Sequence, residues 1–213
     1  MRFVLALLLP LSGCTYGPPH HYAKLENAAG RINTHTIAVA LNCQRLREPT
    51  GLSTFPDGGS PRILEQAALI YVCDVDQPST KLLARIVAPR GMEGAFEPWI
   101  LGWVRDDIFV GLTGYRHSSL RGSVGPLIKQ TYRVGLDGTC QTVEGPPDSL
   151  KQTPNLGIPM KGETNFMRLS KGAFDIGVRL EDGGPYTPLF EVNQAKCTLD
   201  PVRLAKAAPE TGR

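Results

Sequence analysis

Net charge is scarce in this 213-residue sequence, which has 23 Lys and Arg residues against 20 Asp and Glu residues and a formal charge of +3. A balance this small gives no electrostatic argument for nucleic-acid binding, and we expect no nucleic-acid partner. Hydrophobic residues make up 41% of the chain and charged residues 20%, which argues against extended disorder. The composition fits one folded domain of ordinary size, alone or with a tether.

The common catalytic signatures are also missing. The chain contains no phosphate-binding Gly-rich loop that ends in Gly-Lys-Ser/Thr, no Gly-x-Gly-x-x-Gly after a strand, and no His-Glu-x-x-His. Ser123 lies between Gly122 and Gly125, but the glycine spacing is wrong for a nucleophile elbow. These absences favour a protein that is not an enzyme, and we expect no cofactor.

The apolar run at the N-terminus is too short to cross a bilayer. Residues 3–9 are apolar without a break, follow one positive charge at Arg2, and lead to Leu11-Ser12-Gly13-Cys14. A membrane-spanning helix needs about 18 or more apolar residues. A positive charge, a short apolar run, two small residues and a Cys, in that order, predict an export signal over residues 1–13.

The tetrapeptide Leu11-Ser12-Gly13-Cys14 resembles the lipobox of bacterial lipoproteins. The resemblance implies cleavage before Cys14, a diacylglycerol on its thiol, and usually a further acyl chain such as palmitate on its new amine. Two or more chains hold a protein on a membrane almost permanently. Thr15, where inner-membrane lipoproteins of enterobacteria carry Asp, implies the outer membrane facing the periplasm. The alternative interpretation of this segment is a buried N-terminal strand that ends in a Cys.

Four cysteines remain beyond Cys14, namely Cys43, Cys73, Cys140 and Cys197. An even number of cysteines in an exported protein predicts a disulfide framework. Three pairings are possible, and we favour Cys43–Cys73 with Cys140–Cys197 because each bond joins neighbours along the chain. A zinc site is disfavoured because no two of these cysteines have Cys-x-x-Cys spacing.

Short apolar segments separated by turn residues fill the rest of the chain. Residues 36–43 alternate, and residues 67–75 are apolar on both faces, as in a buried central strand. About eight such segments predict an all-β fold, an antiparallel β-sandwich or small barrel. Short terminal helices are expected over residues 22–32 and 200–204. The expected organisation is a signal peptide (1–13), a lipidated N-terminus and tether (14–34), one β-rich domain (35–204) and a flexible tail (205–213).

Trp99 and Trp103 are the strongest candidates for a binding surface. Their i, i+4 spacing places both rings on one face of a strand. An exposed pair would form a platform for a glycan ring or a partner protein. A buried pair would be core, which we favour because Leu101 shares the same face.

His117, with Ser118 or Ser119 and with Asp106, is the best catalytic candidate. A Ser, a His and a carboxylate form a nucleophilic triad if the fold brings them together. The alternative interpretation is a polar turn after a strand, in which Ser supplies turn hydrogen bonds.

Asp74 and Asp76 resemble half of a metal site. On a strand the two carboxylates point the same way and could chelate Ca²⁺ or Mg²⁺. Two ligands are too few for such a site, so we predict no bound metal.

The sequence therefore predicts a lipid-anchored protein of the cell envelope, held on the membrane through acylated Cys14. We expect a non-enzymatic accessory or structural component of an envelope assembly, with an envelope protein as its partner. One alternative is a binding module for cell-wall glycan or a small ligand that uses Trp99 and Trp103. Another is an envelope hydrolase that uses His117 with Ser118 or Ser119.

Overall fold

The computed structural model describes residues 15–31, 34–50, 61–89, 96–117, 124–150, 157–159, 166–171, 175–180 and 186–202. Throughout this part of the chain the regular structure consists of β-strands, and their pairings are antiparallel. The predicted all-β antiparallel fold is confirmed. The described residues include no helix that is long and apolar enough to span a membrane.

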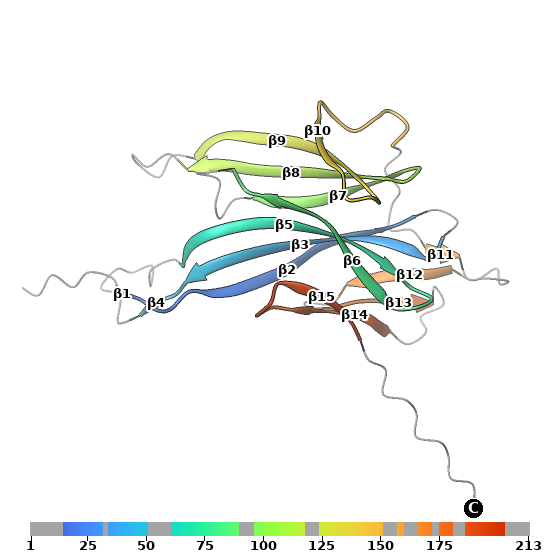
Figure 1. Ribbon diagram of the computed structural model, residues 1–213, viewed down its shortest axis with the longest axis horizontal. Coiled ribbons are helices and arrows are strands. Elements are labelled where there is room, and N and C mark those ends of the chain that lie inside the picture. Colours follow the sequence, from blue (N-terminus) through green and yellow to red (C-terminus); the bar gives the residue numbers. More distant parts are fainter. Residues whose placement is uncertain are drawn as a thin grey trace, which may run out of the picture.

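Three antiparallel sheets stack face to face, with the first in the chain lying between the other two (Figure 1). The first sheet has the order β2-β3-β5-β6 and consists of β2 (His20–Gly30), β3 (Thr36–Arg47), β5 (Arg62–Asp74) and β6 (Ser79–Val87). The second sheet has the order β10-β9-β8-β7 and consists of β7 (Glu97–Val104), β8 (Asp107–His117), β9 (Val124–Gly135) and β10 (Cys140–Val143). The third sheet has the order β11 to β15 and consists of β11 (Gly157–Pro159), β12 (Phe166–Lys171), β13 (Asp175–Leu180), β14 (Thr187–Asn193) and β15 (Thr198–Pro201). A separate two-stranded ladder joins β1 (Thr15–Tyr16) to β4 (Pro49–Thr50).

The central position of the first sheet follows from the sequence of β3 and β5. Successive side chains of a strand point to opposite faces, so Ile37, Val39 and Leu41 pack against the third sheet. Ala38 and Ala40 face the second sheet and pack in a separate cluster. Full burial of each Ile, Val or Leu side chain contributes about 1.5–3 kcal/mol. The prediction that residues 67–75 form a central strand apolar on both faces is confirmed for β5, which ends at Asp74.

The predicted helix over residues 22–32 is wrong, because this segment forms β2. Ala23 and Leu25 are buried beneath the third sheet, with the exposed Lys24 between them. A helix would have placed these side chains on different faces and given up the long ladder with β3. Residues 20–30, which the sequence placed in the tether, are accordingly a strand of the first sheet. At the other terminus, β15 occupies Thr198–Pro201 where the second helix was expected to begin.

The predicted disulfide pairs are also wrong. Cys43 bonds to Cys197, with 5.8 Å between their Cα atoms. Cys73 lies opposite Ile37 on the neighbouring strand, six residues from Cys43, a separation of about 20 Å along the sheet. That distance far exceeds the roughly 7 Å limit for bridging two Cα atoms. Cys140 opens β10 in the second sheet, on the other side of the first sheet from Cys197.

The strand directions give the stack two distinct ends. At one end, which we call the β4 end, β3 finishes at Arg47 and β5 begins at Arg62, beside the β1–β4 ladder. At the opposite end, the turn end, β2 finishes at Gly30 and β3 begins at Thr36, and a short turn joins β5 to β6. The arrowheads of β3 and β8 both point toward the β4 end, on the left of Figure 1.

Candidate functional site

Trp99 is the most exposed large apolar side chain in the described part of the chain, with 54% of its surface accessible. Its neighbours Pro98 and Ile100 are buried beneath the second sheet, so the indole lies on the sheet's outer face. The register of the four strands places three residues in one row with Trp99, in the order Gly111, Thr131 and Val143. We call this row the Trp99 surface.

A β-bulge separates the two tryptophans that the sequence placed on one face. Ile100 pairs with Val110 and Gly102 pairs with Phe109, so Leu101 is an extra residue on β7. The bulge reverses the alternation, and Trp103 consequently turns inward with Ile100. Gly102 has φ 148°, a backbone conformation that favours glycine. The expected shared face is therefore wrong: Trp99 faces outward, and Trp103 packs against the core.

Trp103 belongs to a polar seam between the edge strands β2 and β7. Its indole Nε1 donates to the carbonyl of Ala29 at 3.0 Å. The guanidinium of Arg31 lies 5.6 Å from the centre of the indole ring and also pairs with Asp106 in the β7–β8 turn. Trp103 and Asp106, both candidates from the sequence, thus fasten the first sheet to the second.

A second bulge, on β2, supplies the rest of the seam. Leu25 pairs with Leu41 and Asn27 with Ala40, so Glu26 is the extra residue. The side-chain amide of Asn27 donates through Nδ2 to the backbone carbonyl of Ile100 at 2.9 Å. Its Oδ1 accepts from the backbone N–H of Ile100 at 2.8 Å. This side chain thereby makes both hydrogen bonds that a neighbouring strand would make.

Three buried polar side chains extend the seam into the interior, namely Glu26, Asn42 and Gln66. Asn42 donates to Glu26 at 3.1 Å and to the Phe96 carbonyl at 2.9 Å, and Gln66 donates to Asn42 at 2.7 Å and to the same carbonyl at 2.9 Å. Buried polar groups of this kind fix one arrangement of the sheets because unmade hydrogen bonds are costly. None of these three residues is among the candidates predicted from the sequence. The available signal was Asn42 on β3, a polar residue on the face that Ala38 and Ala40 otherwise form.

The structure does not bring Asp106 together with His117. Asp106 precedes β8 at the turn end, whereas His117 is the last residue of β8 at the β4 end. Eleven residues at about 3.3 Å each separate them by roughly 35 Å, so this carboxylate cannot orient that imidazole. The His117 side chain and Ser118 and Ser119 lie outside the part of the chain whose placement is described.

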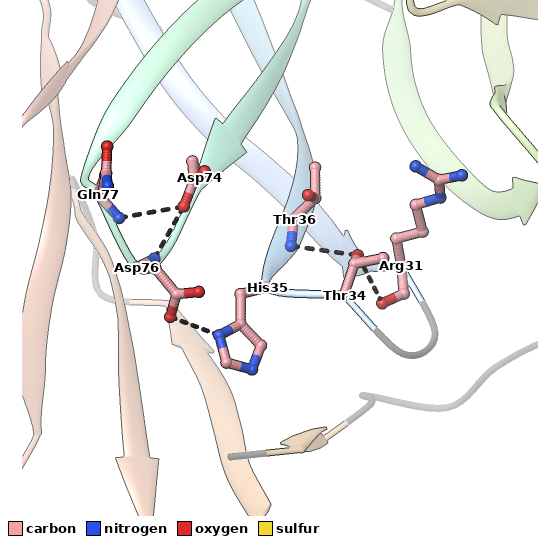
Figure 2. Close-up of polar contacts among 7 residues, drawn as sticks. All are labelled: Arg31, Thr34, His35, Thr36, Asp74, Asp76 and Gln77. Atoms are coloured by element: carbon pink, nitrogen blue, oxygen red, sulfur yellow. Dashed lines mark hydrogen bonds and ion pairs between the residues drawn. The ribbon is translucent and has the colours of Figure 1, made fainter. Parts of the chain in front are cut away.

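Asp74 and Asp76 do not form a shared chelating face, because β5 ends at Asp74 and a turn follows. Figure 2 shows the Asp74 carboxylate accepting hydrogen bonds from the backbone amides of Asp76 and Gln77, at 2.9 and 3.1 Å. The Asp76 carboxylate pairs with Nδ1 of His35, which closes the turn against the β2–β3 connection (Figure 2). Among the described residues no group of three or more His, Cys, Asp and Glu side chains is placed to hold a metal ion.

The two free thiols of the described residues lie in contrasting surroundings. Cys73 is buried in the core between the first and third sheets, and this burial strongly raises the pKa of its thiol. Cys140 is exposed at the start of β10, and partial burial raises its thiol pKa as well. A raised pKa lowers the fraction of reactive thiolate, so neither environment resembles that of an activated cysteine.

The lipobox, with Cys14 and the expected signal peptide, lies outside the described residues, which begin at Thr15. Thr15 pairs with Thr50, and the amide of Gly17 donates to the Glu48 carbonyl at 2.9 Å. The proposed lipid attachment point is therefore one residue away from the β1–β4 ladder.

No protein-family model matches the chain, and no curated protein matches it. Among solved structures, the chain is similar to an acylaminoacyl peptidase in complex with Z-Gly-Gly-Phe-chloromethyl ketone, with a TM-score of 0.27 and 13% sequence identity. The match covers 80% of this chain and 33% of that chain, so this chain spans about a third of the peptidase's length. A similarity at this level supports no inference about activity.

Proposed function

We propose that this protein is a lipid-anchored component of the cell envelope that acts as a non-enzymatic accessory or structural part of an envelope assembly. Acylated Cys14 holds it on the membrane, in the outer membrane facing the periplasm, and an envelope protein binds it. The observation that carries the proposal is the position of the lipobox Cys14 directly before β1. A rigid β-domain attached this closely is suited to presenting a surface at a fixed height above a membrane.

The Trp99 surface is the docking site that we propose for the partner. Trp is among the residues that contribute most to protein interfaces, particularly where half-buried neighbours exclude water from its rim. Leu101 is such a half-buried neighbour, because its side chain lies against Gly111, the residue directly opposite Trp99. Glu97 and Lys129, both exposed, lie in the adjacent row and supply polar rim groups of both signs.

Crosslinking in native envelopes, followed by purification and identification of the attached proteins, tests the proposal. We expect one defined partner with the parent chain and loss of membrane attachment with Cys14→Ala. Trp99→Ala should reduce recovery of the partner by about 30-fold or more, the effect of a hot-spot residue. Leu82→Ala is the matched control, because Leu82 is 47% exposed on β6, away from the Trp99 surface. Equal recovery with Trp99→Ala and with the parent would reject this docking site.

A second candidate function is the binding of cell-wall glycan, favoured by the exposure of Trp99. An indole face stacks well on a sugar ring, and the flat strand face around Trp99 leaves it accessible. Co-sedimentation with purified peptidoglycan distinguishes the two functions. Binding by the parent chain that Trp99→Ala abolishes would support the glycan function, whereas absence of binding would leave the partner protein as the proposal.

A further inference from the structure

Three exposed arginines lie together at the β4 end of the first sheet. Arg45 and Arg47 are near the end of β3, and Arg62 is the first residue of β5. Arg47 and Arg62 are directly opposite each other in the β3–β5 ladder. Directly opposed residues in an antiparallel pair have Cβ atoms about 5 Å apart, where two like charges destabilise the sheet.

Among the described residues, no ion pair neutralises the facing Arg47 and Arg62. Glu65 lies opposite Arg45 in the ladder, but its ion pair is with Arg85. Glu48 lies 3.9 Å from the imidazole of His20. Within the described ranges, no carboxylate forms an ion pair with any of the three arginines. Two facing arginines that repel each other, and that form no ion pair within the described ranges, are a suitable site for an external anion.

The cluster is close to the proposed lipid attachment point. Arg47 is three residues before Thr50, which pairs with Thr15, the residue after Cys14. Three residues of extended chain span about 10 Å, and the long Arg side chain can reach across much of this distance. Tyr16, 38% exposed beside the attachment point, has the amphipathic ring typical of the level of lipid headgroups.

We propose that Arg45, Arg47 and Arg62 bind the phosphates of anionic phospholipid headgroups in the membrane that holds Cys14. The guanidinium fork matches the phosphate oxygens in bidentate geometry and keeps its charge at all physiological pH values. The domain then lies with its β4 end on the bilayer, and the turn end points away from it. This inference rests on the proposed lipidation of Cys14, because lipidation brings the cluster to the membrane.

Vesicle co-sedimentation of the mature chain, residues 14–213 with Cys14→Ala, tests the cluster without a lipid contribution. All the described strands lie within this chain. We expect binding to vesicles of phosphatidylethanolamine with about one third phosphatidylglycerol, weakening as salt is added, and no binding to phosphatidylcholine vesicles. Each arginine removed should weaken binding about fivefold, so Arg47→Ala with Arg62→Ala should weaken it about 25-fold.

Arg105→Ala is the control, because it removes one exposed positive charge from the β7–β8 turn at the turn end. It should leave vesicle binding unchanged. The double arginine variant should remain as stable as the parent or become more stable, since a like-charge pair is removed. Equal binding by the double variant and the parent would overturn the inference, as would binding of the parent to both kinds of vesicle alike.

Mass spectrometry of Cys14 in the native protein separates this inference from the proposed function. Acylated Cys14 together with no preference for anionic vesicles would overturn the inference and leave the anchor standing. Unmodified Cys14 would overturn the anchor, and with it the proximity to the membrane on which this inference depends.

Discussion

Cys43 in the first sheet and Cys197 before the last strand of the third sheet form a disulfide across 154 positions of sequence. The bond fastens the C-terminal sheet to the face of the first sheet that Ile37, Val39 and Leu41 build. In the chain-entropy model, closing a loop of this length stabilises the fold by about 5 kcal/mol. The disulfide therefore completes the three-sheet stack.

Thiol counting tests this connectivity directly. In a mature chain carrying Cys14→Ala, unfolded without reductant, we expect two reactive thiols, those of Cys73 and Cys140. In the folded protein only the exposed Cys140 should react with an aromatic disulfide reagent, because Cys73 is 1% exposed. The Cys140→Ala variant should then show no fast-reacting thiol when folded and one when unfolded. Four thiols in the unfolded chain would contradict the disulfide.

Gly177 allows β13 and β14 to approach closely, and its replacement should be costly. A Cβ at this position would lie 2.2 Å from the Thr187 carbonyl oxygen and 2.8 Å from the Tyr186 ring. The ring cannot easily retreat, because the Tyr186 hydroxyl donates to Asp175 at 2.8 Å. Gly177→Ala should lower the free energy of unfolding by about 3 kcal/mol, measured by urea titration, since backbone must shift to relieve the clash.

Gly145 provides the matched control for this substitution, because nothing lies within 4 Å of the position that its Cβ would take. Gly145→Ala should change the free energy of unfolding by less than about 0.5 kcal/mol. Similar decreases in the free energy of unfolding for the two variants would show that replacing any glycine destabilises the fold, and that the close approach of β14 is not the cause.

Asn27 joins the first and second sheets through its two hydrogen bonds to Ile100. Asn27→Ala leaves both backbone groups of a buried residue without these partners, which costs about 1–3 kcal/mol per unsatisfied group in the most buried cases. We expect a loss of about 2 kcal/mol in the free energy of unfolding. Gln141→Ala, on an exposed position of β10, should have almost no effect. A loss from Asn27→Ala no greater than that from Gln141→Ala would show that the seam does not depend on this amide.

The strands that could be predicted from the sequence were those in which large apolar side chains alternate clearly with smaller ones. In β3, Ile37, Val39 and Leu41 alternate with smaller residues, and this pattern survives in the fold. β2 was mistaken for a helix because its apolar residues are few, and its long ladder with β3 is a tertiary effect that no local pattern reports.

Bulges account for much of what the sequence could not show about the candidate site. One extra residue at Leu101 reverses the alternation and sends Trp99 and Trp103 to opposite faces. One extra residue at Glu26 turns Asn27 toward Ile100. Spacing along the chain cannot reveal either event, because a bulge is set by the pairing with the neighbouring strand. The disulfide partners depend on sheet stacking, which chain proximity likewise does not report.

The ion pair of Lys24 makes the free energy of unfolding depend on pH in the alkaline range. Its ammonium lies 3.0 Å from the carboxylate of the buried Glu26, and this hydrogen bond raises the pKa of Lys24 against the opposing effect of burial. A raised pKa means that the folded protein binds the proton more tightly than the unfolded chain does. The resulting stability is fully present below the ordinary Lys pKa of about 10.4 and is lost as the pH rises through the folded pKa.

Lys24→Met should therefore lower the free energy of unfolding at pH 8 by about 1 kcal/mol or less, because the Lys24 side chain is 53% exposed and solvent screens the pair. The difference between parent and variant should narrow as the pH is raised above about 10.4, since the parent then loses the same interaction. Lys129→Met is the control, because no ion pair of Lys129 occurs among the described residues. Urea titrations at several pH values measure both variants, and a Lys24→Met difference that stays constant to the highest pH would contradict the ion pair as its cause.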